Sequence, residues 1–321
     1  MIHPIPSGTR DVLPDEMREL RAITDALRGV FESAGYGEVW TPTLEYEDVL
    51  RRAGIGAEPA YRVFDDHGEV LALRSDMTVP IARLAATRYA STEPPLRFCY
   101  LAHAYRAVRP HRGQMREFLQ AGVELLGAPA PEGTAEALGL MCRALDAVGL
   151  RGYRVALGDA SLYPALLGAL ELPEEAAVRL LGELVTRDFV GLEREARALG
   201  LSDSDAALLV EVPQIRGGAD VLEVHASGPV ADAVTGLRRV LELLPGAVAE
   251  RVIFDLGLSR GLGYYTGAVF DVLDPAFGSP IGGGGRYDEL MGRFGRPLPA
   301  VGFALGVDRL HLALAGEEGA R

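Results

Sequence analysis

The sequence has no lysine, so all 32 of its basic side chains are arginines. This absence excludes a P-loop lysine, a lysine Schiff base and a pyridoxal phosphate enzyme. Positive charge is scarce as well, because 45 aspartates and glutamates leave the chain with a formal net charge of −13. A chain of this kind offers no evident basic face that could release counterions from a nucleic-acid backbone, so general nucleic-acid binding is disfavoured.

Cysteine, metal-ligand patterns and long apolar runs are also lacking. The two cysteines, Cys99 and Cys142, lie in apolar runs without a CxxC partner, which argues against a disulfide framework or a zinc knuckle and predicts two core thiols. The six histidines lack metal-ligand spacing, so we expect no metal and no other cofactor. No apolar stretch is long enough to span a membrane and no leader-like pattern opens the chain, so we expect a cytoplasmic protein.

The first half of the chain alternates helical and strand patterns. Apolar residues recur at helical spacing from Pro14 until Gly35, which predicts an amphipathic helix. Residues 36–42 predict a short strand, and its Pro42 places it at a sheet edge or a strand end. Residues 96–105 and 119–126 predict two antiparallel strands joined by a long polar loop.

The second half contains a helical stretch and then returns to strands. Residues 159–225 predict an inserted helical subdomain, with a capping box at residues 202–205. Strands are predicted at residues 251–256, 264–273 and 300–305, and a helix begins near Val307. The glycine run at residues 282–285 predicts a turn, with a phosphate cradle as the less favoured alternative. This order of elements favours an α+β fold with a mainly antiparallel sheet flanked by helices.

A site for a free amino acid is suggested by polar residues within these elements. Gln120 and Glu124 lie four apart in a predicted strand, so alternation places them on one face, where both can accept hydrogen bonds. Such a site also needs a second carboxylate, cations for the ligand carboxylate, and a flat wall with hydroxyls for an imidazole. Taken singly, a strand glutamate usually faces water and paired tyrosines usually pack in a core. The residues that could supply these groups together are Asp76, Arg106, Arg260, Tyr264 and Tyr265.

Short blocks along the chain resemble histidyl-tRNA synthetase, a class II aminoacyl-tRNA synthetase. In order, the blocks match that family's opening segment, the end of its dimer-forming first motif, its second motif, its two histidine-specific signatures and its third motif. They lie at residues 8–14, 40–42, 106–124, 260–267, 282–288 and 300–310. The resemblance implies a class II synthetase core at residues 1–158 and 226–321, with residues 159–225 as the insertion.

The resemblance also implies which residues would contact histidine. Nearly all positions that bind histidine in the synthetase carry the same residue type here, apart from a conservative change of glutamate to Asp76. The implied histidine-binding residues are Asp76, Thr78, Arg106, Gln120, Glu124, Arg260, Tyr264 and Tyr265.

Three departures from the family's pattern affect the ATP site. Val108 replaces the glutamate that holds adenine, Gln114 replaces a triphosphate-binding arginine, and Gly263 replaces an acidic residue. A lost acceptor costs about 1–3 kcal/mol, so adenylation is expected to be weak or absent. The remaining arginines could contact a nucleotide or a phosphate, or simply face water; they are Arg109, Arg112, Arg116 and Arg309.

Only residues 310–321 follow the last motif, so we expect no C-terminal anticodon-binding domain and no tRNA. Histidine recognition without adenylation or tRNA selection resembles the regulatory subunits of short-form ATP phosphoribosyltransferase. This second resemblance implies a homodimer within a hetero-oligomer, in which the chain activates a catalytic subunit and histidine acts as feedback inhibitor. The catalytic residues would then lie on the partner.

Two alternatives stay open at this point. One is a free-standing histidine-adenylating enzyme that acts on an acceptor other than tRNA, and Val108 and Gln114 weigh against it. The other is a scaffold that only holds catalytic subunits together, and the retained Gln120, Glu124 and Arg260 weigh against that.

Overall fold

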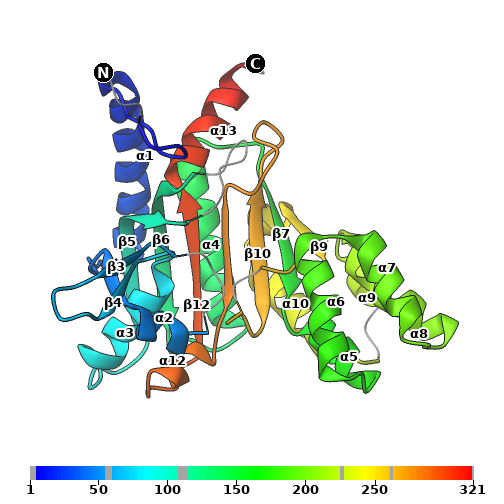
Figure 1. Cartoon of the computed structure of the whole chain (residues 1–321). Helices are drawn as coiled ribbons and strands as arrows, with labels where there is room; N and C mark the ends of the chain where they lie inside the picture. Colours follow the sequence, from blue (N-terminus) through cyan, green and yellow to red (C-terminus); the bar gives the residue numbers. More distant parts are fainter. Residues whose placement is uncertain (1–4, 55–59, 108–114, 225–227, 261–262, 320–321) are drawn as a thin grey trace.

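The computed structural model describes residues 5–54, 60–107, 115–224, 228–260 and 263–319. Within them, the centre of the molecule is a nine-stranded sheet of order β1-β5-β6-β12-β11-β10-β7-β9-β8 (Figure 1). Two pairs, β1 with β5 and β7 with β9, are parallel, and the other pairs are antiparallel. The strands are β1 (Gly37–Glu38), β5 (Leu96–Tyr105), β6 (Glu117–Leu126), β7 (Arg154–Asp159), β8 (Arg216–Gly217), β9 (Val252–Asp255), β10 (Ala268–Leu273), β11 (Gly282–Arg286) and β12 (Ala300–Gly306).

A small sheet and the helices complete the fold, and the predicted α+β class is confirmed. The small sheet, of order β2-β4-β3, contains β2 (Leu44–Tyr46), β3 (Arg62–Phe64) and β4 (Val70–Leu73). The helices are α1 (Pro14–Ser33), α2 (Glu47–Arg52), α3 (Thr78–Thr87), α4 (Glu132–Ala147), α5 (Leu162–Ala169), α6 (Glu174–Thr186), α7 (Phe189–Ala198), α8 (Asp203–Glu211), α9 (Asp220–Val224), α10 (Ala231–Leu243), α11 (Gly246–Ala249), α12 (Leu290–Arg293) and α13 (Val307–Gly319), with a 3₁₀ turn at Val212–Gln214.

One face of the large sheet is covered by α1, α4, α10 and α13, which form the main core (Figure 1). Alternate residues of β6 and β12 point into it, among them Val123 and Phe303, as alternation along a strand requires. The predicted first helix is confirmed as α1, which buries Leu27 and Phe31 against this face. Proline at the helix start and Gly35, with φ of +83°, just past its end explain its limits.

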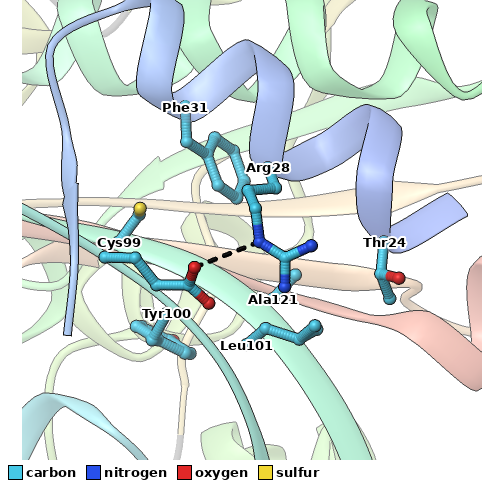
Figure 2. Close-up of a pocket in the computed structure, with 8 residues that line it drawn as sticks. Thr24, Arg28, Phe31, Cys99, Tyr100, Leu101 and Ala121 are labelled. Carbon is cyan, nitrogen blue, oxygen red and sulfur yellow. Dashed lines mark hydrogen bonds and ion pairs between the residues drawn. The ribbon is translucent and has the colours of Figure 1, made fainter. Parts of the chain in front are cut away.

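The packing between α1 and the sheet edge is closed. Arg28 of α1 donates from Nε to Glu38 Oε2 at 3.0 Å, a hydrogen bond drawn as the dashed line from the labelled Arg28 in Figure 2. The cavity beside Cys99 and Phe31 measures about 10 Å³, roughly the room of one water molecule. This cavity is therefore too small for an amino acid. Both cysteines are buried free thiols, as predicted.

Three elements predicted from the sequence differ from the structure, one in type and two in their bounds. Residues 282–285 are not a turn but form β11, paired with β10 and β12. Glycine is unfavourable in most strands, but here the neighbours lie so close that a Cβ on Gly283 would overlap the Arg260 guanidinium. The strand predicted from Tyr264 begins only at Ala268, so both tyrosines precede it. The strand predicted at residues 36–42 is shorter, but β1 does lie at the sheet edge.

Residues 159–225 contain the short helices α5 to α9, at the right of Figure 1. The predicted cap is confirmed, since the Asp205 N–H donates to Ser202 Oγ at 3.2 Å and begins α8. The same stretch also contributes β8, whose Arg216 donates to the buried Asp255 at 2.9 Å. The division into a core and an inserted subdomain stays a prediction. Among the described residues, none of the helices is long and apolar enough to cross a membrane.

Candidate functional site

The face of the sheet opposite the main core carries a buried carboxylate at its centre. Glu124 of β6 is 1% exposed, and its carboxylate accepts a hydrogen bond on each oxygen. Thr78 Oγ1, at the start of α3, donates to Oε1 at 2.7 Å, and the hydroxyl of Tyr287, just after β11, donates to Oε2. Burial raises the pKa of Glu124 to about 8, and nearby Asp76 adds to this, although both hydrogen bonds lower it.

Glycines of β6 itself and of the neighbouring strand β12 make room for this group. Gly302 of β12 lies opposite Glu124 in the sheet, and a Cβ there would overlap Glu124 Oε2. A Cβ on Gly122 would lie 2.5 Å from the hydroxyl oxygen of Tyr100. The glycines on this face are therefore required by close approach of functional side chains.

Three tyrosines surround the carboxylate. The rings of Tyr264 and Tyr265 lie 4.9 Å apart at 51°, and those of Tyr264 and Tyr287 lie 5.7 Å apart in an edge-to-face arrangement. Burial raises the pKa of Tyr264 and of Tyr287 well above the usual value, so their hydroxyls stay protonated donors. Together the rings and hydroxyls form a flat wall with polar ends, which suits an imidazole.

Asp76 supplies the second carboxylate near Glu124. It is buried, and its Oδ1 accepts from the Val79 N–H at 3.0 Å, so the same residue also caps the first turn of α3. Its negative charge raises the pKa of both Glu124 and Tyr264, which places the three groups in one electrostatic neighbourhood.

Positive charge gathers beside this cluster. Arg260 forms an ion pair with Asp271 of β10 and donates to the Phe270 carbonyl at 3.0 Å. Burial lowers the pKa of Arg309, and the charges of Arg106 and Arg260 lower it further, so the Arg309 guanidinium is repelled by the other two. An anionic ligand would relieve this repulsion.

Two buried polar atoms beside these cations have no hydrogen-bond partner among the described residues. They are Nε of Arg106, whose guanidinium lies 5.2 Å above the ring of Phe118, and Oε1 of Gln120. A buried donor and a buried acceptor left without partners cost free energy, which a ligand carrying both kinds of group would recover. As alternation predicted, Gln120 and Glu124 share a face, because both pair with glycines of β12, at Gly306 and Gly302.

Two of the arginines predicted to contact a nucleotide or a phosphate form hydrogen bonds with other parts of the chain. Arg116 donates to the carbonyl and the hydroxyl of Ser7 at 3.1 and 3.2 Å, so it holds the N-terminal segment. Arg309 donates to the Pro280 carbonyl at 2.6 Å while remaining near Arg260. Four residues discussed from the sequence lie outside the described residues, namely Val108, Arg109, Arg112 and Gln114.

Sequence reasoning missed three residues of this cluster. Tyr287 lies in a block that was noted only as a family signature, although a tyrosine directly after a glycine strand is a visible signal. Asp271 interrupts the apolar run of β10, and a lone carboxylate in such a strand marks a buried ion pair. Tyr100 gave no signal, because it stands within the apolar run of residues 98–102 in β5.

Comparisons with known proteins agree with this architecture. The family model described as histidyl-tRNA synthetase matches residues 8–310. A crystal structure of an ATP phosphoribosyltransferase regulatory subunit/histidyl-tRNA synthetase from Bacillus halodurans superposes with a TM-score of 0.90 at 34% identity, covering 98% of this chain and 84% of that one.

Curated relatives carry one name repeatedly. An ATP phosphoribosyltransferase regulatory subunit from Symbiobacterium thermophilum is 43% identical over 96% of this chain and 79% of its own length. The subunit of the same name from Desulforamulus reducens is 39% identical over 97% of this chain and 79% of its own length. This chain therefore belongs to the histidyl-tRNA synthetase-like family of ATP phosphoribosyltransferase regulatory subunits.

Proposed function

We propose that this chain is the regulatory subunit of a short-form ATP phosphoribosyltransferase. It activates a separate catalytic subunit at the first step of histidine biosynthesis, in the cytoplasm, and passes on feedback inhibition by histidine. The observation that carries this proposal is a buried site suited to an amino acid, in a chain whose relatives are named regulatory subunits. We call this site the Glu124 cluster; it consists of Glu124, Asp76, Thr78, Arg106, Gln120, Arg260, Tyr264, Tyr265 and Tyr287. The catalytic residues lie on the partner, and the chain needs no cofactor.

Histidine fits the cluster group by group. An imidazole N–H can donate to Glu124, because each carboxylate oxygen has a further lone pair beyond the bond from Thr78 or Tyr287. The imidazole ring then lies against Tyr264 and Tyr265.

The backbone groups of histidine extend toward the unpartnered atoms. The ammonium donates to Gln120 Oε1 and is balanced by the negative charge of Asp76. The carboxylate accepts from Arg106 and Arg260, and so reduces the repulsion among the arginines. Arg309 lies beside this end and would contact any further phosphate or nucleotide; Arg109, Arg112 and Arg116 are the other candidates from the sequence.

Feedback by histidine requires that the ligand favour one state of the complex. Activation means that this chain binds an active conformation of the catalytic subunit better than an inactive one, and histidine must shift that preference. A coupling of about 1–3 kcal/mol between histidine and the partner is sufficient. Thr78 and Tyr287 belong to different segments and meet at Glu124, so a ligand there can move both.

A homodimer is the second part of the proposal. Trp40, which follows the edge strand β1, is 91% exposed, and Phe64 of the small sheet is 70% exposed. Large aromatic side chains with this exposure are typical of protein interfaces. We assign both side chains to contact with a second copy, and the double variant Trp40→Ser/Phe64→Ser is expected to be monomeric by light scattering. A variant that stays dimeric would refute this assignment.

The decisive experiment is a phosphoribosyl-transfer assay with the cognate short catalytic subunit, with and without this chain, across a histidine titration. We expect strong activation that histidine reverses. A catalytic subunit that is folded and yet indifferent to this chain would refute the regulatory role.

The enzyme alternative makes a different prediction. Clustering of Arg106, Arg260 and Arg309 is the observation in its favour, because adenylation needs cations around a triphosphate. A histidine-adenylating enzyme would catalyse histidine-dependent exchange of pyrophosphate into ATP, whereas we expect histidine binding without exchange.

A matched pair of variants tests the histidine site itself. Glu124→Ala should abolish the response to histidine and leave assembly with the catalytic subunit intact. Glu117→Ala is the control, since this glutamate belongs to the same strand but is only partly buried. Full feedback sensitivity in Glu124→Ala would show that histidine acts elsewhere.

A further inference from the structure

A second cavity, of about 220 Å³, lies where α2, α3 and the residue after α12 meet. These three helices lie in the lower left of Figure 1. Asp48 and Arg52 line the cavity from α2, Arg83 and Thr87 from α3, and Phe294 from the chain after α12. None of these residues belongs to the Glu124 cluster. Its volume is below the roughly 300–1,000 Å³ typical of sites for drug-sized ligands, so it suits a small compound.

The charges around this cavity favour an anion. The Arg52 guanidinium has no ion-pair or hydrogen-bond partner among the described residues. Arg83 donates through Nε to the buried Glu45 at 2.7 Å, which leaves its terminal nitrogens without a hydrogen bond in the described part of the chain. Asp48, the one carboxylate among the described residues that line the cavity, forms an ion pair with Arg51 at 2.9 Å.

The lining also defines the chemical class of the ligand. Two guanidiniums match the planar, two-oxygen edge of a carboxylate or phosphate. The half-buried ring of Phe294 on the same wall offers an apolar surface for a flat group, and the Thr87 side chain adds polarity. A small phosphate or carboxylate joined to a flat apolar group satisfies all of these features.

The cavity is connected to Glu124 through the two segments that line it. Thr78, which donates to Glu124, is the first residue of α3, and Arg83 and Thr87 lie further along the same helix. Tyr287, the other donor, lies three residues before α12, and Phe294 directly follows that helix. Because α3 and α12 also contact each other, a ligand that binds between them can shift both helices, and with them Thr78 and Tyr287, the two donors to Glu124.

We propose that the cavity between Arg52, Arg83 and Phe294 is a second ligand site, which binds a small phosphate- or carboxylate-bearing compound and thereby changes the affinity of the Glu124 cluster for histidine. The binding itself follows from the cavity alone, whereas the coupling rests on the proposed histidine site. By linkage, histidine must change the affinity of the cavity by the same factor.

Calorimetric titration of the whole chain tests the binding, with phenyl phosphate, benzoate and inorganic phosphate as probes. We expect saturable binding of phenyl phosphate or benzoate, with the stronger of the two identifying the anionic group, and weaker binding of inorganic phosphate, which lacks the flat group. Arg52→Gln should weaken binding by about tenfold or more. Arg88→Gln removes the same charge from an exposed position next to Thr87, outside the cavity lining and without a carboxylate partner among the described residues, and should change binding by less than about twofold.

Two results would overturn the site. One is the absence of saturable binding of all three probes up to about 10 mM, a concentration that reveals even very weak sites. The other is an equal loss in Arg52→Gln and Arg88→Gln, which would mean general attraction by positive charge.

The coupling is measured separately, as the histidine affinity with and without the stronger probe at saturation. We expect a shift of about fivefold or more that is absent in Arg52→Gln. Intact probe binding with an unchanged histidine affinity would refute the coupling alone. A chain that binds the probe but not histidine would refute the proposed histidine site and leave the cavity site standing.

Discussion

The two faces of the nine-stranded sheet are built from the same strands and yet have opposite character. Along β12, Val301 and Phe303 point into the helix-covered core, while Gly302 and Ala304, which alternate with them, face the Glu124 cluster. Along β6, Val123 alternates with Glu124 in the same way. One face buries large apolar side chains, and the other buries a carboxylate on a floor of small residues.

This difference separates the source of stability from the source of function. Burial of apolar area provides most of the free energy of folding, so the helix-covered face stabilises the fold. Burial of Glu124, Arg106 and Gln120 costs free energy that is only partly returned by hydrogen bonds. The fold can bear the free-energy cost of the polar face because apolar burial on the helix-covered face offsets it. The polar groups of the second face remain available for a ligand.

The largest expected effect on stability comes from the helix-covered face. Phe303→Ala removes a ring that packs edge to face against Phe31 of α1 at 5.8 Å. We expect a loss of about 3–5 kcal/mol in the free energy of unfolding, measured by urea denaturation. At temperatures where the variant is folded, its histidine affinity should be unchanged. A large loss of affinity in the folded variant would show that the faces are not independent.

The sequence predicted structure best in segments where apolar or polar residues recur at one regular spacing. Helical spacing with proline and glycine at the ends predicted α1, and alternation predicted the shared face of Gln120 and Glu124. Alternation could not predict β11, because glycine has no side chain to reveal a period. The bond from Tyr287 to Glu124 joins residues 163 apart in sequence, and no local pattern carries such a contact.

The pH dependence of the free energy of unfolding should reveal the cost of burying Glu124 on the polar face of the sheet. Burial raises the pKa of Glu124 from its ordinary 4.5 to about 8, so the folded chain keeps a proton that the unfolded chain releases. The stabilisation from this proton is complete below about pH 4.5 and is lost as the pH rises toward 8, with a slope of at most about 1.4 kcal/mol per pH unit.

Glu124→Gln removes this titration and should flatten the decline in stability between pH 5 and pH 8, as followed by urea denaturation across that range. Glu117→Gln, from the same strand, serves as the control and should keep the decline of the original chain. Parallel pH profiles for Glu124→Gln and the original chain would mean that Glu124 is ionised throughout.

A smaller effect is expected from crowding the floor of the site. Gly302→Ala would place a methyl group against Glu124 Oε2 and 2.6 Å from the Val123 carbonyl oxygen. We expect a loss of about 1–3 kcal/mol in stability, as for other overpacked sites, together with a clear loss of histidine affinity. Gly29→Ala, at a helix position where a Cβ would meet no atom within 4 Å, is the control. Normal histidine affinity in Gly302→Ala would show that the ligand does not depend on the position of Glu124.

The smallest effect should come from Cys99, on the helix-covered side of β5. Its Sγ lies 3.6 Å from the Tyr36 carbonyl oxygen, a weak hydrogen bond, and the adjoining cavity of about 10 Å³ can take part of an added methyl group. Cys99→Val should therefore change stability by less than about 1.5 kcal/mol. Its neighbour Tyr100 points to the other face, so histidine affinity should stay the same even though the substitution lies one residue from the site. A variant of normal stability with altered histidine affinity would mean that the strand transmits small movements between its faces, and the separation of stability from function would then fail where the two faces share a backbone.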